Sequence, residues 1–292
     1  MGGNDETRSL LRLNDHSRTG LEAALDRAVS LAAAWEAREM PRTLAGARVA
    51  LIVEERGWRN PVAMALGARA MGAAIETLPQ GLFGAEAPED LGPYLANWFD
   101  ALAVRAPDIV WLEALADAFP GPVLNLRTRA NHPFEVLGDL AFLRSLGRGP
   151  AGLRVAVVAP RGNILASWAE AADALGIAVT QVFDADFHLD GPRGGLAATH
   201  DMEAIADADV IVTDCWPRHE PPRAFPAFRV TAAILDRCRD DVVFIPCPPV
   251  TRGEEVDAAA MRHPRQMAYR AKAFLMHVQL AFLEGALGRD GG

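Results

Sequence analysis

The apolar residues of this chain gather in short runs that alternate with longer stretches of mixed character. Short apolar runs without polar alternation are typical of strands buried on both faces of a parallel sheet. Such runs predict strands at Arg48–Val53, Ala73–Leu78, Ala101–Arg105, Val123–Leu126, Arg154–Ala159, Ile177–Phe183, Val210–Thr213 and Val242–Ile245. Between them, apolar positions with helical spacing predict helices at about 20–38, 63–71, 89–99, 108–115, 132–147, 163–176, 201–206, 231–238 and 264–287.

Strands and helices alternate on both sides of one turn-rich segment, 148–152, which reads RGPAG. This order predicts an α/β fold with two doubly wound parallel-sheet domains. We expect an N-terminal domain over 1–147, a C-terminal domain over 152–263, and a long final helix within 264–292 that joins the N-terminal domain and bridges the two. Asp15 or Ser17 could cap the first helix. Residues 1–15 are expected to be frayed or loosely docked, and residues 184–200 to form a loop.

The composition limits the classes of partner. The 292 residues are 50% hydrophobic and 23% charged, so both domains can bury a core. The net charge of −9 argues against a general nucleic-acid binder and against a binder of anionic membranes, but it does not exclude a local anion pocket built from a few arginines. Three cysteines without CxxC spacing favour a reducing cytoplasm over a disulfide framework. The N-terminus has no signal-type apolar core, and no apolar run is long enough to span a bilayer.

The stretch Phe244–Val256, FIPCPPVTRGEEV, leaves the end of a predicted buried strand. Its prolines prevent both helix and regular strand pairing. Open α/β sheets bind ligands in loops at the carboxyl ends of their strands. Cys247 and Arg252 in this loop are therefore candidate ligand-binding residues. The alternative interpretation is a proline-rich connector with a buried thiol.

A second candidate is the strand-to-helix turn Gly57–Pro61. Such a turn offers backbone N–H groups and a helix N-terminus to an anion, and Arg59 could add a bidentate contact to a phosphate or carboxylate. Arg105 ends a predicted strand and His132 begins a predicted helix; alone, each is more often structural. A helix N-terminus disfavours a protonated histidine, so a neutral His132 could donate a hydrogen bond to a carbonyl oxygen.

Asp214 follows a predicted strand, where a carboxylate could meet the ammonium group of a ligand; the alternative is a local cap. A metal site formed by Cys215, His219 and Cys247 would match no zinc spacing, so we expect no metal. No cofactor is expected.

These segments occur in the order of six motifs of one family. FIPCPPVTRGEEV is similar to HCLPxxRGEEV, TDCW to TDxW, GNILAS to NNxxHS, HPFE to HPxQ and QMAYR to QAENR, and EERGWRNPVA stands where the family has STRTR. Over about residues 20–285, the chain resembles the aspartate/ornithine carbamoyltransferase family, and its ornithine branch most. The resemblance implies a cytoplasmic transferase of amino-acid metabolism, with the family's two-domain fold.

The resemblance also implies roles for matching residues. On the amino-acid side it points to Asn163, Asp214 and Cys247, with Arg252 in the same loop. The donor or anion side comprises Gly57, Trp58, Arg59, Asn60, Arg105, His132 and Arg270, and the expected catalytic residues are His132, Arg105, Glu135 and Cys247. Members form trimers with shared sites, which implies a homotrimer here, with a loop at about 79–90 containing Gln80, Gly81, Glu86 and Glu89 reaching a neighbouring subunit.

Several family residues differ in this chain. The STRTR serine, its two threonines and its last arginine are Gly57, Trp58, Asn60 and Pro61, the HPxQ glutamine is Glu135, the histidine before the loop cysteine is Pro246, and Arg218 and His219 stand where a serine-methionine-glycine segment is expected. Each lost hydrogen bond to a charged phosphate would weaken its binding by about 1.5–3 kcal/mol. Trp58 is expected to fill space that phosphate oxygens would occupy.

Three functions remain. The first is an enzyme that acts on an ornithine-like or other amino acid, with a donor other than carbamoyl phosphate or as a lyase on an N-substituted amino acid, and with Glu135 as a general acid/base. The second is a non-catalytic, amino-acid-binding or anion-binding regulatory homologue. The third is a true transcarbamoylase that uses carbamoyl phosphate. We favour the first function, because candidate residues are retained on both the donor side and the amino-acid side, while the altered residues weaken the binding of carbamoyl phosphate.

Overall fold

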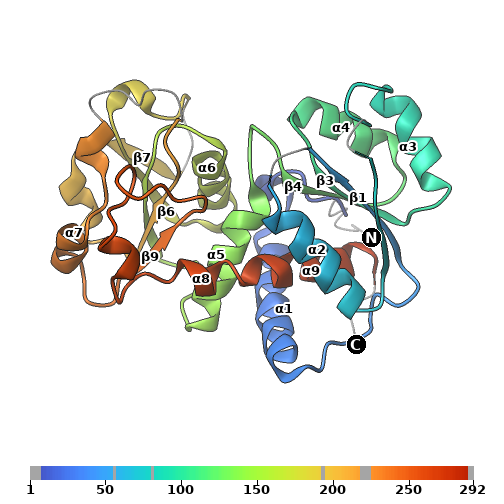
Figure 1. Cartoon of the computed structure of the whole chain (residues 1–292), viewed down its shortest axis with the longest axis horizontal. Coiled ribbons are helices and arrows are strands. Elements are labelled where there is room, and N and C mark those ends of the chain that lie inside the picture. Colours follow the sequence, from blue (N-terminus) through green and yellow to red (C-terminus); the bar gives the residue numbers. More distant parts are fainter. Residues whose placement is uncertain (1–7, 55–56, 80–81, 192–194, 218–224, 289–292) are drawn as a thin grey trace, which may run out of the picture. The chain divides into compact units, whose positions relative to one another are not determined.

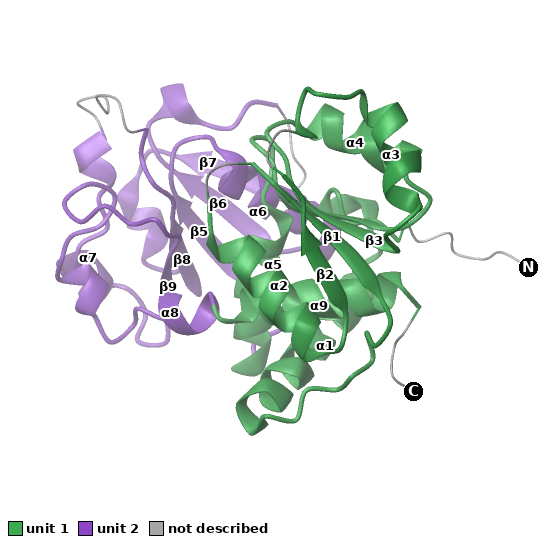
Figure 2. Ribbon diagram, turned by 45° about the vertical axis from the view of Figure 1, so that its right-hand side comes forward, with its two compact units in different colours: residues 1–146, 273–292 green, residues 147–272 purple. Residues whose placement is uncertain are grey.

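The computed structural model describes residues 8–54, 57–79, 82–191, 195–217 and 225–288. The chain divides into two compact units, coloured separately in Figure 2. Unit 1 comprises Met1–Leu146 and Ala273–Gly292, and unit 2 comprises Gly147–Lys272. The chain thus leaves unit 1 after the first half and returns to it for its final helix.

Unit 1 is built on a parallel sheet of four strands in the order β2-β1-β3-β4. The strands are β1 (Arg48–Val53), β2 (Ala74–Thr77), β3 (Ala101–Arg105) and β4 (Val123–Arg127). Helices α3 (Pro88–Ala96) and α4 (Ile109–Ala118) cover one face; α1 (Arg18–Ala37), α2 (Arg59–Ala70), α5 (Pro133–Ser145) and α9 (Phe274–Ala286) cover the other (Figures 1 and 2). Both faces are buried, which explains the continuous apolar strands.

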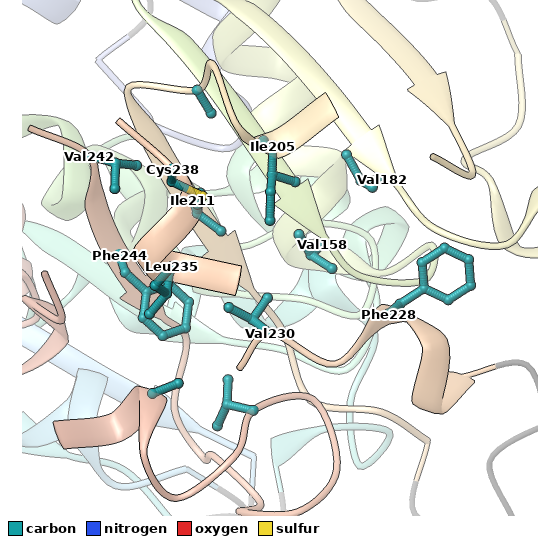
Figure 3. Packing of buried hydrophobic residues seen from close by; sticks show 14 of the residues in the cluster. Val158, Val182, Ile205, Ile211, Phe228, Val230, Leu235, Cys238, Val242 and Phe244 are labelled. Atoms are coloured by element: carbon teal, nitrogen blue, oxygen red, sulfur yellow. The ribbon is translucent and has the colours of Figure 1, made fainter. Parts of the chain in front are cut away.

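Unit 2 has a parallel sheet of five strands in the order β7-β6-β5-β8-β9. These are β5 (Arg154–Val158), β6 (Ala178–Val182), β7 (Leu196–Thr199), β8 (Val210–Thr213) and β9 (Val243–Pro246), with helices α6 (Asn163–Leu175), α7 (Ala232–Arg237) and α8 (Ala268–Ala271). Figure 3 shows a core in which Val158, Val182, Ile211 and Phe244 of the strands meet Leu235 of α7. The prediction of two doubly wound parallel sheets is confirmed.

Three local predictions were wrong. Residues 184–200 contain strand β7, which pairs with β6 at the sheet edge; Gly195 before it lies so close to α6 that an added Cβ would be 2.6 Å from the Ala172 Cβ. The helix expected from 264 begins only at 268, because residues 265–267 lie along β9, where Arg265 and Met267 form two backbone hydrogen bonds of 2.8 Å with Phe244. It also has two parts, α8 and α9.

The third wrong prediction concerns the segment before α1. Residues 8–15 are neither frayed nor loosely docked: Leu10 and Leu13 are fully buried, and the backbone of Leu10 forms hydrogen bonds with Val123 and Asn125 at 3.1 and 2.8 Å. The segment is mostly polar in sequence, so the burial of Leu10 and Leu13 was not predicted. Of the two expected caps, Ser17 is the one used, because its hydroxyl accepts from the Gly20 amide at 3.1 Å.

Each sheet has one point where the chain turns in opposite directions from two adjacent strands. In unit 1 this topological switch lies between β1 and β3, and in unit 2 between β5 and β8. The crevice beyond the carboxyl ends of such strands is where open α/β sheets bind ligands. In the part of the chain that the structure describes, no helix combines the length and apolar character needed to cross a bilayer.

Candidate active site

At the switch point of unit 1, Arg105 lies directly against the turn that follows β1. Arg105 is the last residue of β3, and Gly57 has a φ of 106°. A Cβ on Gly57 would lie 2.6 Å from the guanidinium carbon of Arg105. Only glycine allows both this backbone conformation and this close approach. The turn therefore places the backbone before α2 beside a half-buried cation.

The charge of Arg105 is balanced by its neighbours. The pKa of Arg105 is lowered to about 10, mainly by burial and also by the positive charge of Arg127, while the carboxylates of Glu54 and Glu135 act to raise it. Glu54 also accepts a hydrogen bond from Arg127 at 3.2 Å. Arg105 remains a cation at neutral pH and can bind an anion. Two nearby carboxylates reduce the positive charge available to that anion.

His132, Asn60 and Glu135 form a buried polar cluster around the beginning of α5. They are 8%, 4% and 6% exposed, respectively. The Asn60 Nδ2 lies 3.4 Å from the His132 Nε2, and the Glu135 Oε2 lies 3.7 Å from the same nitrogen. His132 stands at the helix N-cap position and Pro133 begins the helix, which needs no N–H there. The unit thus brings together Gly57, Asn60, Arg105, His132 and Glu135.

Trp58 and Arg59 lie at the outer side of this turn. Trp58 is 66% exposed, and the Arg59 guanidinium lies 5.2 Å from the centre of its ring. Trp58 occupies the N-cap position of α2 with αR dihedral angles. That its indole fills space that phosphate oxygens would occupy stays a prediction. Arg59 is the first residue of α2, where its backbone N–H joins the positive end of the helix.

At the switch point of unit 2, Asn163 and Asp214 come from the two adjacent strand ends. Asn163 is the first residue of α6, following β5, and Asp214 follows β8. An added Cβ on Gly162 would lie 3.7 Å from the Asp214 Oδ2. The Asp214 Oδ1 accepts from the Cys215 backbone N–H at 2.8 Å. The carboxylate is therefore oriented by its own loop, with its second oxygen beside the start of α6.

Cys247 and its loop continue this edge of the sheet. The Cys247 backbone N–H donates to the Thr213 carbonyl at 2.9 Å, and its side chain is 3% exposed. The fully buried Glu255 accepts from the Thr251 N–H at 2.7 Å. Burial raises the pKa of Glu255, against the lowering effect of that hydrogen bond. Arg252 is exposed within the same loop.

Some predicted residues lie elsewhere or outside the description. Arg270 is exposed on α8 and belongs to unit 2. The other expected anion-binding residues belong to unit 1. The described residues include Glu86 and Glu89 of the expected intersubunit loop, but Gln80, Gly81, Arg218 and His219 lie outside them. Among the described side chains, no group of three or more His, Cys, Asp or Glu could hold a metal ion.

Sequence reasoning missed four polar residues that support these clusters, namely Glu54, Arg127, Glu255 and Gln279. Gln279 is fully buried in α9 and donates to the Asn60 Oδ1 at 2.8 Å. One clue was available: Gln279 is an isolated amide in the otherwise apolar run FLMHVQLAFL. An amide buried in such a run needs a partner, so it points to a polar contact with another element.

Comparison with known proteins bears on both units. The family model "Aspartate/ornithine carbamoyltransferase, carbamoyl-P binding domain" matches residues 8–145, and "Aspartate/ornithine carbamoyltransferase, Asp/Orn binding domain" matches residues 151–285. The chain belongs to the aspartate/ornithine carbamoyltransferase family. The earlier resemblance is thereby confirmed, and transfer of a carbamoyl group is the chemistry that names this family.

Individual relatives cover nearly the whole chain. The ornithine carbamoyltransferase of Rhizorhabdus wittichii is 31% identical across 98% of this chain and 100% of that relative. The Cupriavidus metallidurans ornithine carbamoyltransferase is 29% identical across 94% and 95%. Among solved structures, the ornithine carbamoyltransferase of Thermus thermophilus is 28% identical, with a TM-score of 0.88 over 96% of this chain and 99% of that one. The same domain order and lengths therefore recur in these proteins.

Proposed function

We propose that the protein is a transcarbamoylase that transfers the carbamoyl group of carbamoyl phosphate to the amine of an ornithine-like amino acid. The observation that carries the proposal is the placement of Arg105, beneath the Gly57 turn and at the β1/β3 switch point. Arg105 supplies a half-buried cation beside a helix N-terminus, which suits a phosphate. The two family matches and the ornithine carbamoyltransferase relatives support the same activity. Carbamoyl phosphate as the donor thus replaces the different donor that the sequence alone favoured.

In unit 1, the proposed step makes use of two side chains. Arg105 neutralises the phosphate as it becomes the leaving group, and His132 donates a hydrogen bond to the carbamoyl oxygen as negative charge develops there. The amine lone pair attacks the carbamoyl carbon, the bond from that carbon to the phosphate oxygen breaks, and inorganic phosphate leaves. The attacking nitrogen loses one proton, which the departing phosphate accepts. Arg59 and Arg270 are proposed as further anion-binding residues.

In unit 2, the amino acid is proposed to bind at the β5/β8 switch point. Asp214 pairs with its α-ammonium group, and Asn163 at the start of α6 binds its α-carboxylate. Cys247 lies beside the attacking amine, and Arg252 is proposed as a further contact in that loop. Support comes from the position of Gly162 next to the Asp214 carboxylate, which places the two strand ends together.

A second candidate function is favoured by one observation, the buried carboxyl of Glu135. Its Oε2 lies 3.7 Å from the His132 Nε2, and its charge acts on Arg105. A carboxylate there repels a dianion and suits a donor with less negative charge, such as an N-carbamoyl or other N-substituted amino acid. In that case Glu135 is the general acid/base.

The quaternary structure is also a proposal. A homotrimer would place the loop at about 79–90 of one subunit beside the site of its neighbour. We further propose that the two domains close over bound ligands, as lids do in many enzymes. Analytical ultracentrifugation tests the first point, and small-angle scattering with and without carbamoyl phosphate tests the second. A monomer, or unchanged scattering with a ligand that binds, would contradict the respective proposal.

The test of the activity is direct. Purified protein is incubated with carbon-labelled carbamoyl phosphate and a panel of amines that includes ornithine, aspartate and putrescine, and labelled ureido product is detected by mass spectrometry. Labelled ureido product with one of the amino acids supports the first function. Absence of product from every amine contradicts it.

The Glu135→Gln variant separates the two candidates. Removing this carboxylate from the proposed phosphate site should lower the KM for carbamoyl phosphate about tenfold if that molecule is a substrate. If Glu135 is instead the general acid/base for another donor, the variant loses that activity and gains none. Asp139→Asn is the matched control, because Asp139 is a buried carboxyl one turn further along α5. It should leave the KM unchanged.

A further inference from the structure

A polar chain of three buried side chains runs from the final helix to the histidine of the unit 1 cluster. Gln279 in α9 donates from its Nε2 to the Asn60 Oδ1 at 2.8 Å. The Asn60 Nδ2 then faces the His132 Nε2 at 3.4 Å, the long end of hydrogen-bond distances. Gln279 is fully buried and Asn60 and His132 nearly so, so solvent does not compete for these groups.

The direction of this chain has a chemical consequence. An amide has one acceptor end and one donor end. Because the oxygen of Asn60 is engaged by the Gln279 amide, its nitrogen is the end presented to the imidazole. That nitrogen can only donate, so the His132 Nε2 must accept. A neutral imidazole that accepts at Nε2 carries its proton on Nδ1.

The three helices that carry these residues are held at close range. A Cβ added to Gly67 of α2 would lie 2.7 Å from a methyl carbon of Leu280 and 2.8 Å from the Met276 Cγ, both in α9. A Cβ added to Gly138 of α5 would lie 3.2 Å from the backbone nitrogen of Leu275 in α9. Two glycines thus let α2 and α5 approach α9 closely, and the amides have little freedom to shift.

We propose that Gln279 is a positioning residue that acts through Asn60 to hold His132 in the tautomer protonated at Nδ1. Its effect opposes that of Glu135, whose Oε2 lies 3.7 Å from the same Nε2 and would favour a proton there. Asn60 is the nearer of the two, and its donor end is fixed by Gln279. The neutral ring then carries its one proton on Nδ1, an atom that is buried in the ligand-free protein.

The catalytic consequence rests on the proposed function, whereas the tautomer does not. If His132 donates to the carbamoyl oxygen, the wrong tautomer removes the proton from the reacting atom. When a catalytic histidine carries its proton on the wrong ring nitrogen, kcat can fall by about 10⁴-fold. Loss of the Gln279 amide, which biases the tautomer without abolishing the donor, should lower kcat about tenfold to a hundredfold with a smaller change in KM.

The experiment is nitrogen NMR of the histidine rings in the full-length, ligand-free protein, with nitrogen-15-labelled histidine. The His132 signals are assigned by their loss in His132→Gln. In the wild-type protein we expect a protonated Nδ1 and an unprotonated Nε2. In Asn60→Asp, the carboxylate accepts from both neighbours, so the proton should move to Nε2. In Gln279→Leu, Asn60 can turn its amide, and a mixture of the two tautomers is expected.

Leu280→Ala is the matched control. It loosens the contact of α9 with Gly67 next to Gln279 but leaves all three polar groups in place. It should lower the melting temperature and keep the wild-type tautomer. A wild-type protein with its proton on Nε2 would overturn the proposal, and so would unchanged His132 signals in Asn60→Asp or Gln279→Leu. If one variant does not fold, the wild-type spectrum and the other variant decide the outcome.

The measurement also separates this proposal from the proposed function. A protein with the expected tautomer but no carbamoyl transfer to any amine contradicts the function and leaves the positioning role intact. A protein that transfers carbamoyl groups but holds the proton on Nε2 contradicts the positioning role alone.

Discussion

The two switch points of this protein use opposite ways of holding polar groups. In unit 1, polar side chains hold one another. Buried side chains contact each other in the order Gln279, Asn60, His132 and Glu135. In unit 2, the main chain holds the side chains, as the Cys215 amide holds Asp214 and the Thr251 amide holds Glu255. A side-chain network fixes proton positions, whereas a loop held by its own amides can carry varied ligand contacts.

Electrostatics follows the same division. Arg105 of unit 1 experiences two carboxylates and a second guanidinium, so its site is charged but nearly balanced. In unit 2, Glu255 experiences Glu254 and Asp214, which are charges of its own sign, and its burial adds to their effect. The nearly balanced site of unit 1 suits a bound group whose charge changes during a reaction. The negatively charged surroundings in unit 2 suit the binding of a cationic amine. Four experiments test this contrast between the two units.

The largest effect is expected from Arg105→Met. Under the proposed function, loss of this cation should lower kcat/KM for carbamoyl phosphate about 10³-fold, because preorganised donors to a charged group contribute that much. The fold should survive, since a half-buried arginine has a desolvation cost that methionine avoids. Steady-state kinetics and a thermal melt measure the two quantities. Full activity, or collapse of the melt, would make Arg105 structural.

Asp214→Asn should affect the amino acid alone. Loss of a charged hydrogen bond to an ammonium group costs about 1.5–3 kcal/mol, which corresponds to a rise in KM of about tenfold to a hundredfold. Asp201→Asn is the control, because Asp201 also caps a local turn of unit 2, accepting from the Glu203 N–H at 2.9 Å. Equal effects of the two variants on KM would mean that Asp214 acts only as a local cap.

His277 tests how the side-chain framework of unit 1 responds to acid. Burial lowers the pKa of this α9 imidazole from 6.5 to about 4, so the unfolded chain binds its proton at a higher pH than the folded chain. Stability is therefore lost as the pH falls below about 6.5, by about 2 kcal/mol between pH 7 and pH 5. Urea unfolding of wild type and His277→Gln measures it. Equal pH dependence in both proteins would contradict the assignment.

The smallest effect is expected from Glu255→Gln. Its pKa is raised by burial, so Glu255 holds its proton in the folded state at pH values where the unfolded chain has lost it. Its contribution to stability consequently falls as the pH rises above the ordinary range of a glutamate. The amide variant should retain the bond from Thr251 and show less loss of stability on the alkaline side. Chemical unfolding at pH 5 and pH 8 provides the comparison, and a steeper loss in the variant would be the opposite result.

The sequence predicted the sheets well, because strands buried on both faces leave continuous apolar runs such as RVALIV and VIVT. It failed at β7, whose residues Leu196–Thr199 form a short edge strand with only modest apolar character. It also failed at residues 8–15, where docking depends on Val123 and Asn125 far along the chain. Local pattern carries no information about such distant partners.

The candidate site was predictable only in part. Arg105 and His132 stood out because they end a strand and begin a helix, and the switch points explain why those ends matter. Gln279 was missed, since its partner Asn60 is 219 positions away. Which donor the site takes depends on the balance between Arg105 and Glu135. That balance depends on burial, which is a property of the folded chain.

The return of the chain to unit 1 has a consequence for biosynthesis. Helix α9 supplies Gln279 to Asn60, and its Glu284 binds Arg27 at 2.6 and 2.8 Å. Both partners lie in the part of the polypeptide that the ribosome makes first. The intervening segment, Gly147–Lys272, is complete before α9 emerges. The first-made half of the protein can therefore complete its fold only after α9 has been made, and until then its helices α1, α2 and α5 lack the helix that packs against them.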